Sequence, residues 1–231
     1  MSERFAIYFA PPASGDLARF GDHWLGRNVE TGAVLEQPDL SGFDAARLRE
    51  LTEAPRQYGF HGTLKPPFRL ADGCDAGGLR RSLAGFAAQR RGFEVEALAL
   101  EGIGDFIALV PDGSPPALSD LADLCVNEFD RYRAPPDAAE LARRHAAGLT
   151  PRQAQLLARW GYPYVLDEFR FHLTLTGPIA DAAERARVAR LLGPLVAPLL
   201  PQPVPVQELC LFHQPDRAAP FRLIQRFPFG R

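Results

Sequence analysis

Apolar runs and amphipathic stretches follow one another in the same order twice along the chain. Residues 5–10 (FAIYFA) predict a buried strand, and a turn with two prolines leads from it into a helix that ends near Leu25. Residues 106–110 (FIALV) predict a second buried strand, followed by a Pro/Gly/Ser turn and a helix at 118–132 with apolar residues at helical spacing. Each strand and helix precede one copy of a short histidine motif.

The elements after each histidine motif repeat as well. The first motif is followed by a predicted helix near 78–90 and a strand at 93–100. The second motif is followed by a predicted helix near 182–192 and a strand at 204–212, and a last strand near 221–227 closes the chain. Repeats of this length indicate a pseudo-symmetric pair of lobes, because the period of a solenoid is far shorter.

Two insertions of different character interrupt the repeat. Residues 26–55 are rich in loop signals, with one expected helix at 44–52 that stops before the proline at 55. Residues 137–161 predict a helical hairpin, whose second helix is capped by Thr150 and ended by Gly161. A packing hairpin or lid is the simpler interpretation, and a DNA-binding helix-turn-helix is the alternative, although the surrounding charge is mixed.

Composition narrows the classes of function. A formal net charge of −2 argues against a protein that binds nucleic acid mainly through phosphates, so we expect any anion site to be small and local. The three cysteines include no CxxC pair, which predicts neither a disulfide framework nor a thiolate zinc site and favours a reducing, cytoplasmic location. The N-terminal residues lack the features of a signal peptide, and the run 191–200 is too short to span a membrane.

The histidine motifs are nearly identical: FHGTL at residues 60–64 and FHLTL at residues 171–175. If both are extended, side chains alternate, so that His61 and Thr63 share one face of the first strand, while His172 and Thr174 share one face of the second. Two such strands can direct both imidazoles and both hydroxyls at one point. That set suits a phosphodiester, with one histidine as base, the other as acid, and threonines donating to the non-bridging oxygens.

The paired motifs resemble those of the two-histidine (2H) phosphoesterase superfamily. The segments at 58–68 (YGFHGTLKPPF), 159–165 (RWGYPYV) and 169–178 (FRFHLTLTGP) are similar to a largely uncharacterised bacterial branch often encoded beside phosphonate-utilisation genes. This resemblance covers essentially the whole chain, although the spacing of 111 positions between the two histidines is wider than in compact members.

The resemblance implies a fold and an activity. The expected fold is α+β: one bilobal domain over residues 1–231, with halves roughly 1–104 and 105–231 that exchange strands. Each lobe is an antiparallel sheet with outer helices, and the lobes flank a central cleft. The implied activity is that of a phosphodiesterase that uses neither a metal nor another cofactor. His61 and His172 would be its acid and base, and Thr63 and Thr174 would hold the phosphate.

Further residues are candidates for substrate contacts. Lys65 is the only lysine beside 25 arginines, and alternation places it on the face of His61, so we expect it to bind phosphate. Arg170 holds the comparable position before His172. Four tyrosines could line the cleft or stack on a sugar or base, although ordinary packing would look the same: Tyr8, Tyr58, Tyr162 and Tyr164.

Three functions remain open at this point. The leading hypothesis is a metal-independent phosphoesterase or cyclic phosphodiesterase acting on a small phosphorylated metabolite linked to phosphonate metabolism, such as a ribose cyclic phosphate. The alternatives are an RNA enzyme that processes 2′,3′-cyclic or 2′-5′ ends, and a module that binds a nucleotide without turnover. A metal site is disfavoured, because each motif strand offers one imidazole and no carboxylate on its polar face. We expect no membrane partner.

Overall fold

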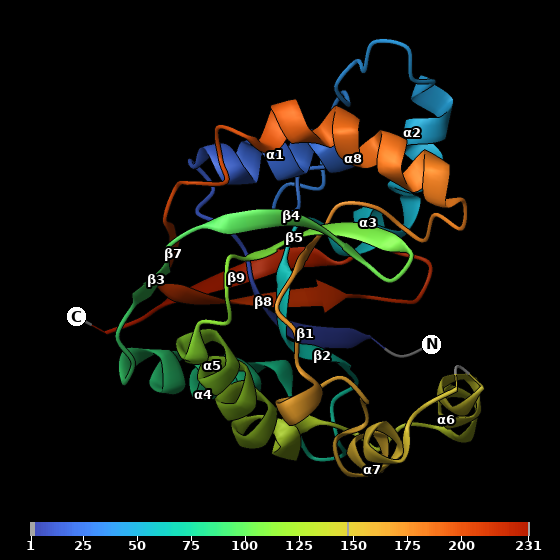
Figure 1. Cartoon of the computed structure of the whole chain (residues 1–231). Coiled ribbons are helices and arrows are strands. Elements are labelled where there is room, and N and C mark those ends of the chain that lie inside the picture. The colour runs from blue at the N-terminus through green and yellow to red at the C-terminus, as the bar shows by residue number, and fades with distance from the viewer. Residues whose placement is uncertain (1–2, 147, 231) are drawn as a thin grey trace.

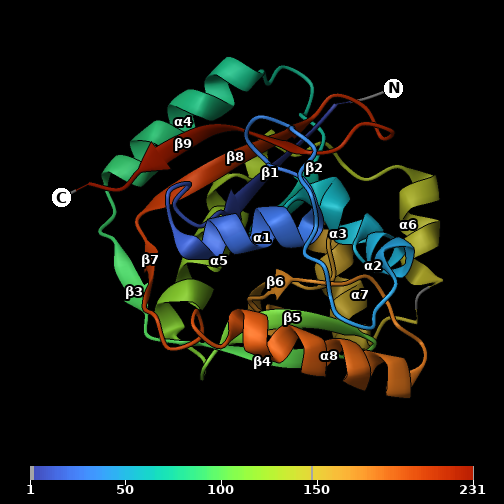
Figure 2. The same cartoon turned by 90° about the horizontal axis from the view of Figure 1, so that it is seen from above.

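Antiparallel strands from both halves of the chain form one large sheet in the computed structural model, which describes residues 3–146 and 148–230 (Figures 1 and 2). Seven strands of the described residues follow one another in the order β4-β5-β6-β2-β1-β8-β9. Their bounds are β1 Arg4–Phe9, β2 Gly62–Phe68, β4 Leu98–Ile103, β5 Phe106–Pro111, β6 Leu173–Thr174, β8 Glu208–Gln214 and β9 Arg222–Pro228. The expected α+β class with an antiparallel sheet is confirmed.

The two halves of this sheet meet at one register pair. Strands β2, β1, β8 and β9 form one half, strands β4, β5 and β6 form the other, and Gly62 opposite Leu173 connects them. Strand β8 comes from the second half of the chain but pairs with β1, whereas β4 comes from the first half but pairs with β5. Each half of the sheet is therefore built from both halves of the chain.

The two long apolar strands expected after the motifs each divide into two. Residues 93–100 contribute β3 (Phe93–Val95) and then β4, and residues 204–212 contribute β7 (Val204–Val206) and then β8. Strands β3 and β7 pair with each other in a separate two-stranded sheet. The expectation of two continuous strands is wrong, because the chain changes its pairing partner at both places.

Helices cover the sheet on opposite sides (Figure 1). Helix α8 (Ala182–Val196) packs on β4 and β5, while α4 (Ala76–Ala88) packs on β8 and β9, and α5 (Pro116–Glu128) packs on β2. Helix α1 (Asp16–Leu25) lies on the same side as α8, and its Trp24 donates a buried hydrogen bond of 2.7 Å from Nε1 to the carbonyl of Leu175. This bond fixes α1 to the segment that carries the second motif.

The insertions contribute the remaining α-helices of the described residues. The first insertion forms α2 (Ala45–Leu51), capped by Asp44 as expected, and α3 (Glu53–Tyr58). Helix α3 differs from the prediction that helical structure stops before Pro55, because a proline is tolerated in the first turn of a helix. The second insertion forms the predicted hairpin of α6 (Ala138–His145) and α7 (Pro151–Trp160), with a capping box at Thr150 and Gly161 at φ 72°.

Close packing at the junction of the two motif strands requires a glycine. A Cβ added to Gly62 would lie 2.5 Å from Cζ of Phe171, so the ring of the second motif fills the space above the first. The phenylalanine of the first motif also packs against a glycine, since the ring of Phe60 fills the space beside Gly21 of α1. The phenylalanines of both motifs therefore position the strands, and the polar residues between them remain available for chemistry.

A Gly62→Ala substitution is expected to destabilise the fold by about 1–3 kcal/mol, because overpacking forces the ring of Phe171 or the backbone to move. Gly85→Ala is the matched control: Gly85 lies in α4 with open space around its Cβ position, so alanine should stabilise by up to about 1 kcal/mol. Urea unfolding measures both. A Gly62→Ala protein as stable as the wild type would contradict the close packing.

Candidate active site

The register of the two motif strands places the four polar motif residues on one face. Gly62 lies opposite Leu173 in an antiparallel pair, so continuing the register by one residue sets His61 opposite Thr174 and Thr63 opposite His172. All four side chains point away from the face of Gly62 and Leu173, since successive side chains alternate. Residues directly opposite have Cβ atoms about 5 Å apart and diagonal ones about 7–8 Å. The imidazoles thus occupy one diagonal and the hydroxyls the other.

Both imidazoles are held by the same backbone contact. Nδ1 of His61 lies 2.8 Å from the carbonyl oxygen of Gly59, and Nδ1 of His172 lies 2.8 Å from the carbonyl oxygen of Arg170. A carbonyl oxygen can only accept, so Nδ1 carries the proton in both rings. In the neutral tautomer Nε2 is then left as an acceptor, and each ring presents an unprotonated nitrogen to the polar face.

His61 is half-buried against aromatic rings. The ring of Tyr8 stacks on it with centroids 3.8 Å apart and an angle of 22° between the planes, and the ring of Tyr58 lies 6.1 Å away. The hydroxyl of Thr63 lies 3.2 Å from Nε2 and can donate to it. Burial, with a smaller contribution from the positive form of His172, lowers the pKa of His61 from 6.5 to about 4. His61 is therefore neutral over most of the physiological range.

His172 lies in a more open environment. Its nearest aromatic neighbour is Phe106, with ring centroids 5.6 Å apart. Burial again lowers its pKa, and the guanidinium of Arg170 acts in the same direction. The two histidines are thus alike in tautomer but differ in packing, since a stacked ring covers only His61.

A pocket of about 250 Å³ opens beside this polar face. Its lining is mostly apolar, with His61 and Thr174 at the polar end: Ala54, Pro55, Tyr58, His61, Phe106, Thr174, Thr176, Gly177 and Pro178. The hydroxyl of Thr176 accepts a 3.0 Å bond from the amide of Ile107 and is buried, so it serves the backbone. The pocket has room for one small ring system next to the histidine–threonine face.

Lys65 does not face this pocket, which corrects the expectation that it binds phosphate. A register shift between β1 and β2 makes Tyr8 pair with Thr63 but Ile7 with Lys65, so Lys65 turns toward the side of Ile7. Its side chain is 2% exposed, and Nζ donates to the carbonyl of Val126 at 3.1 Å and lies 3.7 Å from the carboxylate of Asp130. Burial lowers the pKa of Lys65 to about 8. Its contacts are those of a structural lysine.

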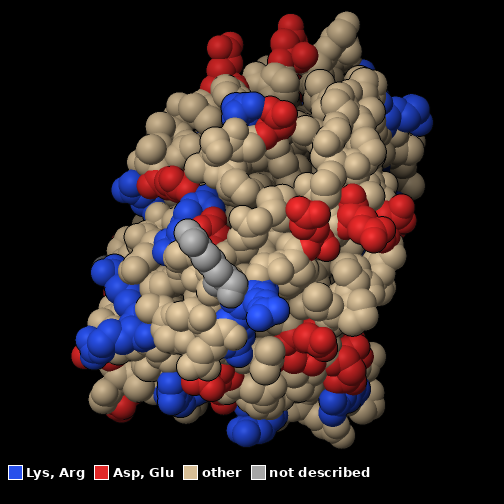
Figure 3. All heavy atoms as spheres, turned by 90° about the vertical axis from the view of Figure 1, so that its left-hand side faces the viewer, with Lys and Arg blue, Asp and Glu red and all other residues tan. Residues whose placement is uncertain are grey.

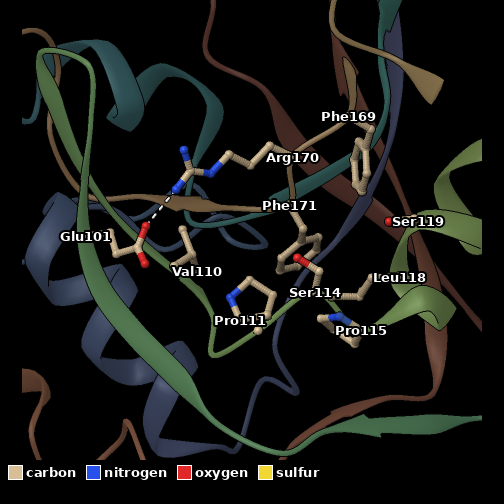
Figure 4. Close-up of a pocket in the computed structure, with 11 residues that line it drawn as sticks. Glu101, Val110, Pro111, Ser114, Pro115, Leu118, Ser119, Phe169, Arg170 and Phe171 are labelled. Atoms are coloured by element: carbon tan, nitrogen blue, oxygen red, sulfur yellow. Dashed lines mark hydrogen bonds and ion pairs between the residues drawn. The ribbon is translucent and has the colours of Figure 1, made fainter. Parts of the chain in front are cut away.

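Arg170 contributes through its backbone carbonyl, while its side chain points elsewhere. The guanidinium forms a 2.6 Å ion pair with Glu101 at the rim of a separate pocket of about 460 Å³ (Figure 4). Phe171 lines that second pocket, whereas the register of the motif strands places His172 on the opposite face of its strand. The Arg170 side chain is therefore paired with Glu101, while its charge lowers the pKa of His172.

The four candidate tyrosines have different positions. Tyr8 is only 1% exposed and supports His61, while Tyr58 lines the pocket beside the histidine. Tyr162 is half-buried and Tyr164 is 46% exposed, with their rings 5.7 Å apart beyond the end of α7. Tyr8 and Tyr58 thus touch or adjoin His61 directly, and Tyr162 and Tyr164 lie on the segment that follows the second insertion.

Three further residues of the site carried no sequence signal. Gly59, at φ 81°, offers the carbonyl that orients His61, and Phe106 flanks His172. Arg27 is 5% exposed and donates to the carbonyls of Arg56 and Phe221 at 3.0 and 2.9 Å, next to Gly59. It holds the loop before His61 in place. In the described part of the chain, histidine, cysteine and carboxylate side chains form no cluster of three or more that could hold a metal.

Comparison with known proteins gives a family without an assigned activity. Residues 63–222 match the family described as "Protein of unknown function (DUF1045)". The chain is 36% identical over 230 residues to "Ribose 1,5-bisphosphate phosphokinase PhnN" of Janthinobacterium sp. (strain Marseille), covering 98% of this chain and 51% of that protein. The PhnN of Laribacter hongkongensis (strain HLHK9) is 34% identical over 220 residues, covering 95% and 50%.

The chain therefore spans about half the length of the curated relatives it matches. Among solved structures, Escherichia coli LigT complexed with 3′-AMP is similar over the full length of both chains, at 14% identity and a TM-score of 0.46. A similarity of this degree does not assign an activity. No helix of the described residues is long and apolar enough to cross a bilayer.

Burial of His61 is expected to make the fold less stable in acid. The unfolded chain binds a proton at this histidine below about pH 6.5, whereas the folded chain binds it only near pH 4, so the free energy of unfolding falls as the pH drops between these values. The free energy of unfolding, measured in urea, should fall between pH 7 and pH 4.5 in both proteins. The fall should be about 1–3 kcal/mol smaller in His61→Asn than in the wild type. The exposed His23→Asn is the control, and equal losses in wild type and His61→Asn would contradict the account.

Proposed function

We propose that this chain, which belongs to the DUF1045 family of proteins of unknown function, is a phosphodiesterase that hydrolyses a small cyclic phosphodiester. One observation carries the proposal: the register of Gly62 with Leu173 directs two histidines and two threonines to one face beside a small pocket. A pair of imidazoles supplies a base and an acid without further groups, and a pair of hydroxyls supplies donors for a phosphoryl group.

The mechanism follows from the state of each ring. Nε2 of neutral His61 takes a proton from a water molecule as the water oxygen bonds to phosphorus. The bond from phosphorus to the departing sugar oxygen breaks, and protonated His172 gives the proton on its Nε2 to that oxygen. Once the attacking water replaces the hydroxyl of Thr63 at Nε2 of His61, Thr63 and Thr174 donate hydrogen bonds to the non-bridging oxygens, where negative charge grows. His61 is assigned as base because Tyr8 and burial keep it neutral.

The substrate proposed is a cyclic phosphate of a small sugar linked to phosphonate metabolism. The relatives' name includes a kinase activity on ribose 1,5-bisphosphate, but this chain has no GxxxxGK[ST] phosphate loop, and its single lysine is the buried Lys65. We place the kinase activity of those relatives in the half that this chain does not match. Hydrolysis of a ribose cyclic phosphate would yield a ribose phosphate, the class of compound on which such a kinase acts.

Processing of RNA ends is the alternative from the same chemistry, favoured by the aromatic lining of the pocket near Tyr58 and Phe106. The small pocket and the net charge of −2 argue for a small molecule instead. Figure 3 shows basic and acidic side chains interspersed over one face of the molecule, as on an ordinary solvated surface. A steep salt dependence of RNA binding would favour the alternative. Tight binding of a nucleotide without turnover would favour a binding module.

Removal of either imidazole is expected to abolish most of the activity. His61→Ala and His172→Ala should each lower kcat on a panel of cyclic phosphodiesters by about 10²–10⁴-fold, the range for a positioned acid or base. His23→Ala, an exposed histidine on α1, should leave it unchanged, and EDTA should have no effect on the wild type. Retention of full activity in either motif variant would contradict the mechanism.

The activity is expected to peak on the acid side of neutral pH. The base must be unprotonated, and the pKa of His61 is about 4, so kcat/KM should rise through that region. The acid must be protonated, and burial holds the pKa of His172 below 6.5, so kcat/KM should fall again before neutrality. A pH profile of kcat/KM tests this, and an optimum above pH 7.5 would count against it.

A further inference from the structure

Arg4 at the start of β1 and Arg144 on α6 make no ion pair with a carboxylate among the described residues. Other arginines of the chain do form such pairs, for example Arg47 with Glu184 and Arg152 with Asp167. Cations without a carboxylate partner, placed beside a pocket that takes an anionic substrate, are candidates for a second anion contact.

Arg4 is held with part of its guanidinium still available. Nε and Nη2 donate to the same oxygen of Gln214, at 2.7 Å from Nε, and the group lies over the ring of Phe221 at 5.2 Å from its centroid. Nη1 donates no hydrogen bond within residues 3–146 and 148–230. Because Arg4 and Tyr8 are four residues apart on one strand, their side chains share the face that carries His61.

Arg144 approaches the same region from the second insertion. Its guanidinium lies 4.4 Å from the ring centroid of Tyr162, and its Nε is buried without a hydrogen-bond partner among the described residues. A buried nitrogen without a partner is costly, so an anion bound at the other nitrogens of this guanidinium would stabilise it. Arg4, Glu140 and Gly161 line one small pocket, which brings the start of β1 against α6 and the end of α7.

A continuous aromatic wall connects these arginines with the histidines. The ring of Phe221, under Arg4, stacks on Tyr58 at 5.4 Å, and Tyr58 lies 6.1 Å from His61. Tyr8 lies between them, 3.8 Å from His61 and 6.3 Å from Phe221. Burial raises the pKa of the Tyr8 hydroxyl, the hydroxyls of Tyr58 and Tyr162 raise it further, and the guanidinium of Arg4 lowers it.

We propose that Arg4 and Arg144, with the hydroxyls of Tyr58 and Tyr162, form a subsite for a second, non-reacting phosphate of the substrate. This assignment rests on the proposed phosphodiesterase function and narrows it to cyclic phosphodiesters that carry a distal phosphomonoester. The four-residue step from Tyr8 to Arg4 spans about 13 Å along the strand, so the second phosphate belongs several bonds away from the reacting phosphorus. A pentose with phosphates at its two ends has that form.

The test compares two substrates that differ only in the second phosphate: ribose 1,2-cyclic phosphate with and without a 5-phosphate. The wild type is expected to prefer the phosphorylated compound in kcat/KM by about 10-fold or more, the size of a charge-assisted contact. Arg144→Gln should reduce that ratio by about 10-fold. Arg143→Gln is the matched control, because Arg143 is its exposed neighbour on α6 and the change of charge is the same.

Binding of ribose 5-phosphate, measured by calorimetry on wild type and both variants, tests the subsite without turnover. The proposal requires weaker binding in Arg144→Gln and unchanged binding in Arg143→Gln. Equal values of kcat/KM for the two substrates in the wild type would overturn the proposal. An equal loss of ribose 5-phosphate binding in both variants would also overturn it. A preference for an oligonucleotide ending in a 2′,3′-cyclic phosphate would overturn it in favour of RNA. If neither sugar is hydrolysed while ribose 5-phosphate still binds through Arg144, the proposed function fails and the subsite stands.

Discussion

One backbone pairing, between Gly62 and Leu173, determines how the two halves of this molecule meet. It joins the two parts of the sheet, and its register decides that His61 faces Thr174 and Thr63 faces His172. A slip of one residue would turn one pair of polar side chains to the opposite face. The ring of Phe171 packed over Gly62 and the bond from Trp24 to the Leu175 carbonyl keep that register in place. Packing on the apolar side thus specifies the geometry on the polar side.

The same arrangement sets the electrostatics of the site. Two imidazoles placed near each other and withdrawn from water are both driven toward the neutral form, with Nδ1 of each bound to a carbonyl two residues earlier. A bound phosphate would reverse this tendency, because a negative charge between the rings favours a proton on one of them. Burial therefore favours the neutral rings in the free site, and a bound anion favours a proton on one of them, which suits acid–base chemistry on a phosphodiester.

The sequence predicted those parts of the structure that depend on local rules. The repeated motifs, the alternation of His61 with Thr63, and the cap of α7 at Thr150 all follow from residues within a few positions of one another. The expectations that the structure contradicts depend on contacts between residues that are far apart in the sequence. A register shift against β1 turns Lys65 into the interior, and the guanidinium of Arg170 forms an ion pair with Glu101. The exchange of strands at 93–100 and 204–212 likewise requires partners from the other half of the chain.

The most direct test of the account is nuclear magnetic resonance of the imidazole nitrogens of His61 and His172 during a titration with inorganic phosphate. Before phosphate is added, both rings should show the tautomer with the proton on Nδ1. During the titration, the Nε2 signals of both histidines should shift together with a single dissociation constant, because one anion contacts both. Shifts confined to one histidine, or two different dissociation constants, would contradict the claim that both rings serve a single phosphorus centre.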